Sequence, residues 1–366
     1  MSIRSRPWGE TASDGRFLAM WRGLTENAAE PNPFLEPWAL LPALESHDAA
    51  RRCDILTIES GDALIGLIPV ARHGLYYRYP LPHLRNWMHG NAFLGTPLVA
   101  SGQEDAFWTA LLEWADERAG SALFLHLSQL DEEGPLLASL RGILADQTRP
   151  AAIVHREERA LLQSDLGPEA YLAASMSGKK RKELRRQHRR LAEEGQLEFR
   201  REGDDTGLLA WTDAFLALEK AGWKGENGSA LACDPATANM FRKTLGGAAS
   251  AGKLERLSFW FDGKPIAMLA NFLTPPGAFS YKTAYDESFA RFSPGVLLQL
   301  ENLALLDHPQ IDWCDSCASQ DHPMIDRIWR EKRTIVRVSI AIGGRARQSI
   351  CRQILRREAG TEMGEL

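Results

Sequence analysis

Residues 254–286 read LERLSFWFDGKPIAMLANFLTPPGAFSYKTAYD. Two apolar runs, 254–261 and 265–273, flank Asp262-Gly263, a dipeptide typical of a two-residue hairpin turn. A third run, 278–286, has the aromatic content of a strand. The stretch therefore predicts an antiparallel hairpin followed by a third strand.

The segment after these strands predicts a ligand site. Gly295 opens a predicted helix that runs to about Leu306, and 310–317 reads as another strand. A helix start offers free backbone N–H groups and the positive end of a dipole, which suit a pyrophosphate. Gly295 would let that backbone approach a ligand closely. The alternative is an ordinary Ser-Pro-Gly helix cap at Ser293.

The same order of elements occurs earlier in the chain. Residues 53–72 read as a hairpin, and a helix at 104–118 and an apolar strand at 121–130 follow it. The two hairpins align at an offset of 201 residues, which sets Ile65-Gly66 on Ile266-Ala267. This repetition predicts a duplicated unit, and so two similar mixed sheets.

The predicted break between the two halves lies near residues 163–170, at Gly167-Pro168. We therefore predict an N-terminal domain at 1–165, a C-terminal domain at 166–345, and a basic helix and tail at 346–366.

Composition favours a globular protein of the cytoplasm. The 366 residues are 44% hydrophobic and 25% charged. The first twenty residues include charged side chains and do not resemble a signal peptide, and no stretch has the length and apolarity of a membrane span. Five scattered cysteines fit a reducing compartment better than a disulfide framework, and we expect no metal site.

Two basic stretches contrast with an acidic remainder. Residues 178–201 carry ten Lys/Arg and four Glu, and 327–357 carry ten Lys/Arg and one Glu, in a chain of net charge −5. The predicted helix 179–194 begins after Ser177, a suitable N-cap, and includes Lys179 and Arg181. Its charges could hold a phosphate of a cofactor, an acyl carrier protein or a nucleic-acid backbone, or could simply be solvated.

Further candidate residues lie near the third strand. Glu219, on a predicted amphipathic helix, could act as a general base. Tyr285 and Asp286 lie at the strand end. Strand alternation places Tyr281 and Tyr285 on one face, and Lys282 on the other with Asp286. A structural ion pair of Lys282 and Asp286 is the alternative to a ligand site.

The loop at 291–296 resembles the coenzyme A pyrophosphate loop of the GNAT (acyl-CoA N-acyltransferase) superfamily. That loop has the form Arg/Gln-x-x-Gly-x-Gly/Ala. Arg291 matches its first position, whereas Pro294 replaces the first glycine and Val296 replaces the last small residue. Further stretches resemble the CelD-like branch, which is related to the Fem-type aminoacyl ligases: SGKKRKELRRQHRRLAEEG, LEKAGWKGENGSAL, DGKPIAMLANF, YKTAYDESFARFSPGVLL and DSCASQDHPMIDRIWREKR.

This resemblance implies an α/β fold with mixed sheets and two tandem GNAT-like domains. It implies an acyltransferase that moves an acyl group from acyl-CoA (acetyl-CoA or longer) to an amine or hydroxyl, in polysaccharide or cell-envelope metabolism. The implied partners are a small-molecule, saccharide or peptide acceptor and an acyl carrier protein. The predicted catalytic residues are Glu219, Tyr285 and Asp286. The predicted donor contacts are Lys179, Arg181, Lys282, Arg291, Ser293, Gly295 and Val296.

Two other functions remain open at this stage. One is a Fem-like transferase that uses aminoacyl-tRNA, which the basic helix and the missing first glycine suggest. The basic helix carries no interleaved aromatic residues, so tRNA ranks below acyl-CoA. The other is a non-catalytic accessory protein of polysaccharide synthesis that keeps the GNAT shape.

Overall fold

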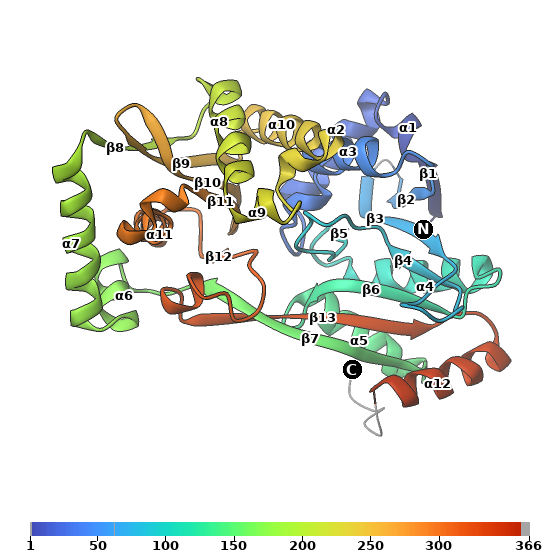
Figure 1. Cartoon of the computed structure of the whole chain (residues 1–366). Helices are drawn as coiled ribbons and strands as arrows, with labels where there is room; N and C mark the ends of the chain where they lie inside the picture. Colours follow the sequence, from blue (N-terminus) through green and yellow to red (C-terminus); the bar gives the residue numbers. More distant parts are fainter. Residues whose placement is uncertain (1, 62, 360–366) are drawn as a thin grey trace. The chain divides into compact units, whose positions relative to one another are not determined.

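The computed structural model describes residues 2–61 and 63–359, and the chain divides into two compact units. Unit 1 comprises residues 1–157 and 334–366, and unit 2 comprises residues 158–333. Figure 1 shows the elements of both, and each unit is described by itself below.

Unit 1 is built on a sheet with the strand order β1-β2-β3-β4-β6-β13, and β5 pairs with β3. Its elements are β1 (Ser2–Pro7), α1 (Trp8–Thr11), α2 (Gly15–Glu26), η1 (Pro33–Leu35), α3 (Pro37–His47), β2 (Cys53–Ser60), β3 (Ala63–His73), β4 (His83–Asn86), β5 (Leu98–Val99), α4 (Glu104–Arg118), β6 (Phe124–Asp131), α5 (Pro135–Asp146) and α12 (Arg345–Ala359). Helices α4 and α5 bury their apolar faces against β3, β6 and β13 in one core.

Unit 2 has the strand order β7-β12-β11-β10-β9-β8. Its elements are α6 (Pro168–Ser175), α7 (Gly178–Glu194), β8 (Leu197–Glu202), α8 (Leu208–Ala221), α9 (Trp223–Glu226), η2 (Leu231–Cys233), α10 (Pro235–Ser250), β9 (Leu254–Phe261), β10 (Lys264–Thr274), β11 (Gly277–Tyr285), η3 (Glu287–Phe292), α11 (Pro294–Asn302), η4 (Leu303–Asp307), β12 (Trp313–Asp315) and η5 (Ile325–Arg327). A core formed by α7, α11 and the sheet holds it together.

The predicted repetition is present. In each unit an antiparallel hairpin precedes a third antiparallel strand, and a helix then leads to a strand parallel to the third. In the second hairpin both Asp262 and Gly263 adopt positive φ angles, 48° and 75°. This is the geometry of a type I′ turn, which matches strand twist. Asp62, in the corresponding turn of the first hairpin, lies outside the described residues.

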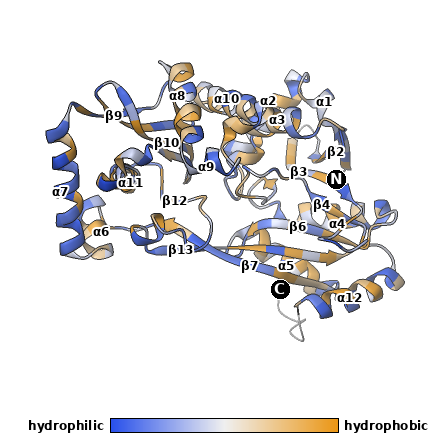
Figure 2. Ribbon diagram, viewed as in Figure 1, coloured by the Kyte–Doolittle hydropathy of each residue, from blue (hydrophilic) through white to orange (hydrophobic). Residues whose placement is uncertain are grey.

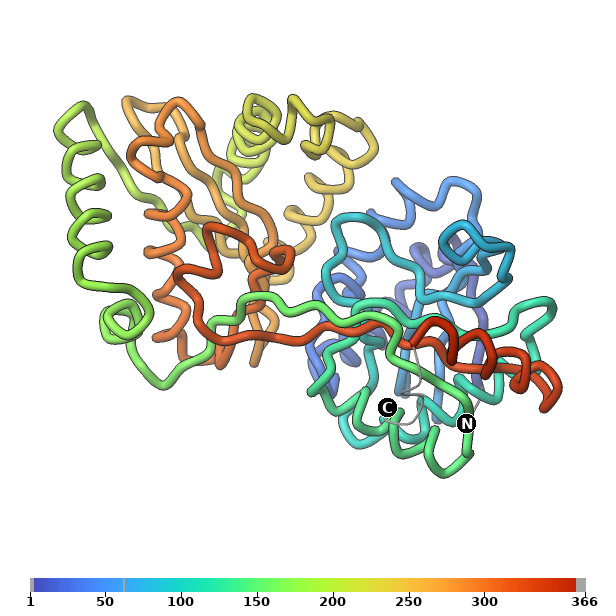
Figure 3. Tube along the Cα trace, turned by 60° about the horizontal axis from the view of Figure 1, so that its bottom comes forward, coloured from blue at the N-terminus to red at the C-terminus, as the bar shows by residue number. Residues whose placement is uncertain are grey.

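Strands β7 (Ala151–Leu162) and β13 (Glu331–Ala341) both run from one unit into the other. They are neighbours in the sheet and run side by side (Figures 1 and 3). Residues 335–341 of β13 pair with β6, whereas Leu161 and Leu162 of β7 pair with β12. The prediction of two separate sheets was wrong, because strand pairing continues from β13 through β7 to β12 in one sheet.

The domain limits 1–165 and 166–345 stay a prediction. The chain divides differently in the structure, because 334–345 packs with unit 1, where Val336, Val338 and Ile340 are fully buried. The predicted basic C-terminal helix is α12, and its predicted tail, 360–366, lies outside the described residues.

None of the helices within the described residues has the length and apolar character needed to cross a bilayer.

Candidate active site

Strands β11 and β12 part soon after they begin to pair. Their parallel pairing joins residues 277–279 to 313–315. On its other edge β11 stays paired with β10 as far as Tyr285. The last part of β11 therefore has an edge that β12 does not cover. The loop at 291–296 follows this open edge and leads directly into α11, as the sequence predicts.

A cavity of about 440 Å³ lies at this end of β11. Helices α8 and α9, the end of β11 and the segment after β12 form its walls. The polar side chains that line it are Glu219, Lys224, Thr283, Tyr285, Glu287 and His322. Two of the three predicted catalytic residues, Glu219 and Tyr285, thus lie together in one cavity.

Glu219 is held more tightly than the sequence suggests. Its side chain is 2% exposed. One carboxylate oxygen accepts a hydrogen bond from Lys224 Nζ at 2.9 Å, and the other accepts from the backbone N–H of Leu231 at 2.8 Å. Lys224 also donates to the carbonyl oxygen of Thr283, at 3.3 Å. The pair therefore fixes an ammonium group beside the open edge of β11.

Tyr285 separates the cavity from the start of α11. A Cβ atom added to Gly295 would lie 3.1 Å from Tyr285 Cδ1 and 3.3 Å from Met324 Sδ. Both neighbours line the cavity. A valine side chain at position 295 would therefore meet both residues, so Gly295→Val would disturb the packing as well as any ligand.

The first turn of α11 has no side-chain cap. Ser293 precedes it with φ 54°, in the left-handed region. Val296 is half-buried against the core of unit 2. The exposed Arg291 forms an ion pair with Glu194 of α7 at 2.6 Å, and its carbonyl oxygen accepts from Gln187 Nε2. These contacts fix the basic helix α7 to the loop before α11.

Helix α7 shows the strongest separation of polar and apolar residues. Leu184 and Leu191 are buried, and the outer face is hydrophilic along its whole length (Figure 2). Lys179 is exposed in its first turn. Arg181 is half-buried, and its Nε has no hydrogen-bond partner among the described residues.

Lys282 and Asp286 each contact neighbours along their own segment of the chain. In β11 a bulge lies between Lys282 and Ser280, the partners of Ala270 and Asn271 in β10. It breaks the alternation of side chains between the two faces of the strand. Lys282 lies 5.7 Å from the centre of the Tyr281 ring, and burial, then the charge of Lys224, lowers its pKa to about 8. Asp286 accepts hydrogen bonds from the N–H and hydroxyl of Ser288. It therefore caps η3 and does not line the cavity.

The bulge also separates the two tyrosines of this strand. Tyr281 stacks on Phe241 of α10, whereas Tyr285 lies against α11. The predicted alternation, with both tyrosines on one face, was therefore wrong.

His322 could flank the site on the evidence of the sequence, where a structural role was the alternative. It lies on the segment after β12 and lines the cavity opposite α8 and α9. Burial lowers its pKa and the charge of Lys224 adds to this, while Asp326 acts in the opposite direction. The buried Nδ1 atom has no hydrogen-bond partner among the described residues.

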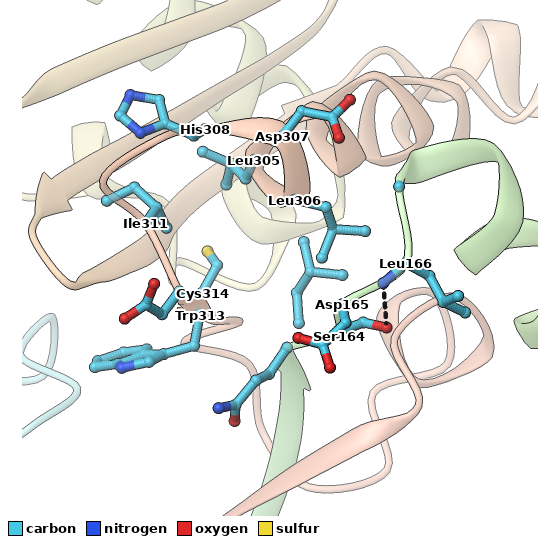
Figure 4. Close-up of a pocket in the computed structure, with 14 residues that line it drawn as sticks. Ser164, Asp165, Leu166, Leu305, Leu306, Asp307, His308, Ile311, Trp313 and Cys314 are labelled. Carbon is cyan, nitrogen blue, oxygen red and sulfur yellow. Dashed lines mark hydrogen bonds between the residues drawn. The ribbon is translucent and has the colours of Figure 1, made fainter.

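A second cavity, of about 670 Å³, lies in unit 2 between the segment after β7 and the segment before β12 (Figure 4). Its charged lining consists of Asp165, Asp307 and Asp312, with His308 beside them. Carboxylates repel phosphates, so this cavity does not suit an anionic donor.

Comparison with known proteins agrees with this geometry. Residues 178–322 match the family model described as an acetyltransferase (GNAT) domain. Among curated proteins, none matches the chain.

Solved structures share the fold at low sequence identity. A conserved protein of unknown function from Bacteroides thetaiotaomicron VPI-5482 is 13% identical with a TM-score of 0.57, over 88% of this chain and 97% of that one. FemX is 10% identical with a TM-score of 0.56, over 98% of this chain and 99% of its own. L-PGS from Bacillus licheniformis is 12% identical with a TM-score of 0.55, over 97% and 99%.

These likenesses extend over both units, so the mixed α/β fold is confirmed, and the GNAT match itself covers residues 178–322. Over residues 178–322, which include the cavity and the start of α11, this chain carries an acetyltransferase domain of the GNAT family.

Proposed function

We propose that the protein is an acyltransferase that moves an acyl group from acyl-CoA to an amine or hydroxyl acceptor. The observation that carries the proposal is the parting of β11 from β12 beside a cavity that contains Glu219, Lys224, Tyr285 and His322. An extended thioester can lie along an uncovered strand edge, whose backbone groups can bond to its amides.

The donor phosphates would bind at the start of α11. Its first turn has uncapped N–H groups, and Lys179 and Arg181 lie on the helix that is tied to the preceding loop. Helix N-termini favour anions because of their free donors and dipole. Ser293, Gly295 and Val296 would supply backbone contacts. Arg291 would change partner from Glu194 to phosphate, and Lys282 would act near the thioester.

The reaction proposed is direct attack of the acceptor on the thioester carbonyl. Lys224 is held by Glu219 and Thr283, and it could donate to the carbonyl oxygen as negative charge develops there. Tyr285 lies between the donor loop and the cavity, a position suited to orienting the thioester. The acceptor would be a saccharide, peptide or other small molecule of polysaccharide or cell-envelope metabolism, acylated in the cytoplasm.

The donor site can be tested with one charge at Ser293. Ser293→Asp adds a carboxylate at a position where Asp is tolerated, both in the left-handed region and before a helix. We expect acyl-CoA affinity, measured by calorimetry, to fall at least tenfold, about 1.4 kcal/mol, through repulsion of the phosphates.

Ser293→Asn is the matched neutral control and should keep most of the affinity. Equal affinity of the Asp and Asn variants would place the phosphates elsewhere.

A Fem-like transfer from aminoacyl-tRNA is the second candidate, and the basic face of α7 favours it. Lys179, Lys180, Lys182, Arg185 and Arg190 are exposed or nearly so along that helix. Titration of tRNA and acyl-CoA at two salt concentrations separates the candidates. Each phosphate contact of a nucleic acid adds roughly 0.7–0.9 to the slope of log affinity against log salt.

Replacement of these five residues by Gln should abolish a steep slope if tRNA is the donor. Steep tRNA binding without acyl-CoA binding would overturn our first proposal. Binding of neither would favour a non-catalytic accessory protein.

A further inference from the structure

The cavity needs a group that can accept a proton, and Glu219 is poorly placed to be that group. An acceptor amine or hydroxyl must lose a proton when it attacks a thioester. Both oxygens of Glu219 already accept hydrogen bonds, one from a cation, and the side chain is 2% exposed. A base must come within hydrogen-bond reach of the acceptor. To do so, Glu219 would have to break its pair with Lys224.

His322 meets the requirements that Glu219 does not. It lines the same cavity, from the segment after β12. Its Nδ1 atom is buried and makes no hydrogen bond within the described part of the chain. A buried polar atom without a partner costs free energy and is commonly satisfied by water or a ligand. Nδ1 itself is closed off from the cavity, so a bound acceptor would meet the other ring nitrogen, Nε2, which is not among the buried atoms without a partner.

Burial favours the neutral form of the ring, against the charge of Asp326. The groups that face the cavity with it are Lys224, Glu219, Tyr285 and Glu287, and Asp326 follows it in the next turn of chain. Burial and Lys224 lower the pKa of His322, and Asp326 opposes them. The lowered pKa favours the unprotonated ring that a base requires.

We infer that His322 is the general base for acyl transfer, and that Glu219 is a positioning residue that acts through Lys224. This inference rests on the proposed function. The acceptor nitrogen or oxygen forms a bond to the thioester carbonyl carbon while His322 takes its proton. The carbon–sulfur bond then breaks, and the leaving thiolate takes that proton from the imidazolium. The products are the acylated acceptor and a free thiol, so atoms and charges balance.

The first test compares His322→Gln with the unaltered protein in acyl transfer. We expect kcat/KM to fall by about 100-fold or more, the usual contribution of a general base, with donor affinity unchanged. For the unaltered protein, kcat/KM should rise with pH through one ionisation below 6.5. For the variant, kcat/KM should not show this rise. His308→Gln, which changes a histidine of the other cavity, is the matched control and should change neither.

The outcomes separate the inference from the proposed function. If His322→Gln keeps kcat/KM within threefold of the unaltered protein and shows the same rise with pH, the inference is overturned and the proposed function is not. Absence of transfer by the unaltered, folded protein with any acyl-CoA overturns the proposed function, and the base with it.

An NMR titration of the histidine side chains gives a reading without any substrate. The signal that His322→Gln removes should titrate below the ordinary histidine range, and a ring that stays protonated throughout the pH range of activity overturns the inference.

Discussion

The Glu219–Lys224 pair is the residue-scale feature with the clearest energetic consequence. Glu219→Gln removes the charge that balances Lys224 but keeps one hydrogen-bonding oxygen. We expect the free energy of unfolding to fall by about 1–3 kcal/mol in urea denaturation. Lys224→Met should also destabilise, because Glu219 then stays buried with one partner, Leu231 N–H.

The double variant should lose less than the sum of the two single changes, by about 1 kcal/mol. The exposed pair Arg200–Glu198 is the control and should show weaker coupling. Strict additivity at Glu219 and Lys224 would mean that they do not act as a pair.

The buried His126 makes the stability of the folded chain depend on pH. It is buried, and its Nδ1 lies 2.9 Å from Ser339 Oγ. Burial, then the charge of Arg85, lowers its pKa from 6.5 to about 3. Between these values the unfolded chain binds more protons than the folded one, so stability rises with pH there and is lost as pH falls.

We expect the free energy of unfolding to fall by about 2 kcal/mol from pH 7 to pH 5 because of His126 alone. Urea denaturation at both values measures it. His126→Gln should reduce the difference by this amount, and an undiminished difference would assign it to other groups.

The sequence identifies Glu219 and Tyr285 but not their surroundings. Glu219 is recognisable because it lies near the end of an amphipathic helix. Its partner Lys224 follows five residues later, beyond a glycine at which the helix ends, so helical spacing does not relate them. Asp286 reads as catalytic although it caps η3, since a capping carboxylate and a catalytic one look alike in sequence.

At the scale of elements, the first turn of α11 is closely packed. A Cβ at Gly295 would meet Tyr285 and Met324 at 3.1 and 3.3 Å, whereas one at Gly246 in α10 would meet nothing within 4 Å. Gly246→Ala should therefore stabilise the protein by about 0.5–1 kcal/mol through helix propensity. Gly295→Ala should not stabilise it, and Gly295→Val should destabilise it by about 1–3 kcal/mol.

Thermal unfolding of the three variants gives the comparison. Equal stabilisation by both alanine substitutions would mean that Tyr285 and Met324 move aside without cost.

Long elements with a clear period were predictable, and short or irregular ones were not. Helix α4 has the predicted limits, 104–118. Strand β12 was predicted as 310–317 but comprises Trp313–Asp315, because it parts from β11. The bulge in β11 also leaves no mark in the sequence, since it depends on the pairing with β10.

At the scale of the whole molecule, Asp315 binds both the strand through which the chain enters unit 2 and the strand through which it leaves. It is fully buried. Arg159 of β7 and Arg333 of β13 each lie 2.9 Å from the same oxygen, Oδ2. Asp315→Asn would leave two buried guanidinium groups without this charge, and we expect a loss of about 3–5 kcal/mol in the free energy of unfolding.

Asp312→Asn changes an exposed carboxylate three residues away and should have an effect within about 0.5 kcal/mol. A loss at Asp315 no larger than this would mean that the arginines find other partners.

The division of the chain was not predictable from the repeat. The sequence suggests two successive halves because hairpin, helix and strand recur in order. The residue patterns of β7 and β13 do not indicate which strands they pair with, because a buried strand can pair with any apolar edge. Pairing with β6 and burial in the core of unit 1 assign residues 335–341 to that unit.

The position of β13 bears on how the chain folds as it leaves the ribosome. Residues 158–333 are complete before any of 335–341 is synthesised. Unit 1 therefore begins first but finishes last, and during the interval the edge of β6 lacks its neighbour. An unpaired strand edge invites wrong partners. Nascent chains that stop before residue 334 should accordingly be the species most prone to capture by chaperones.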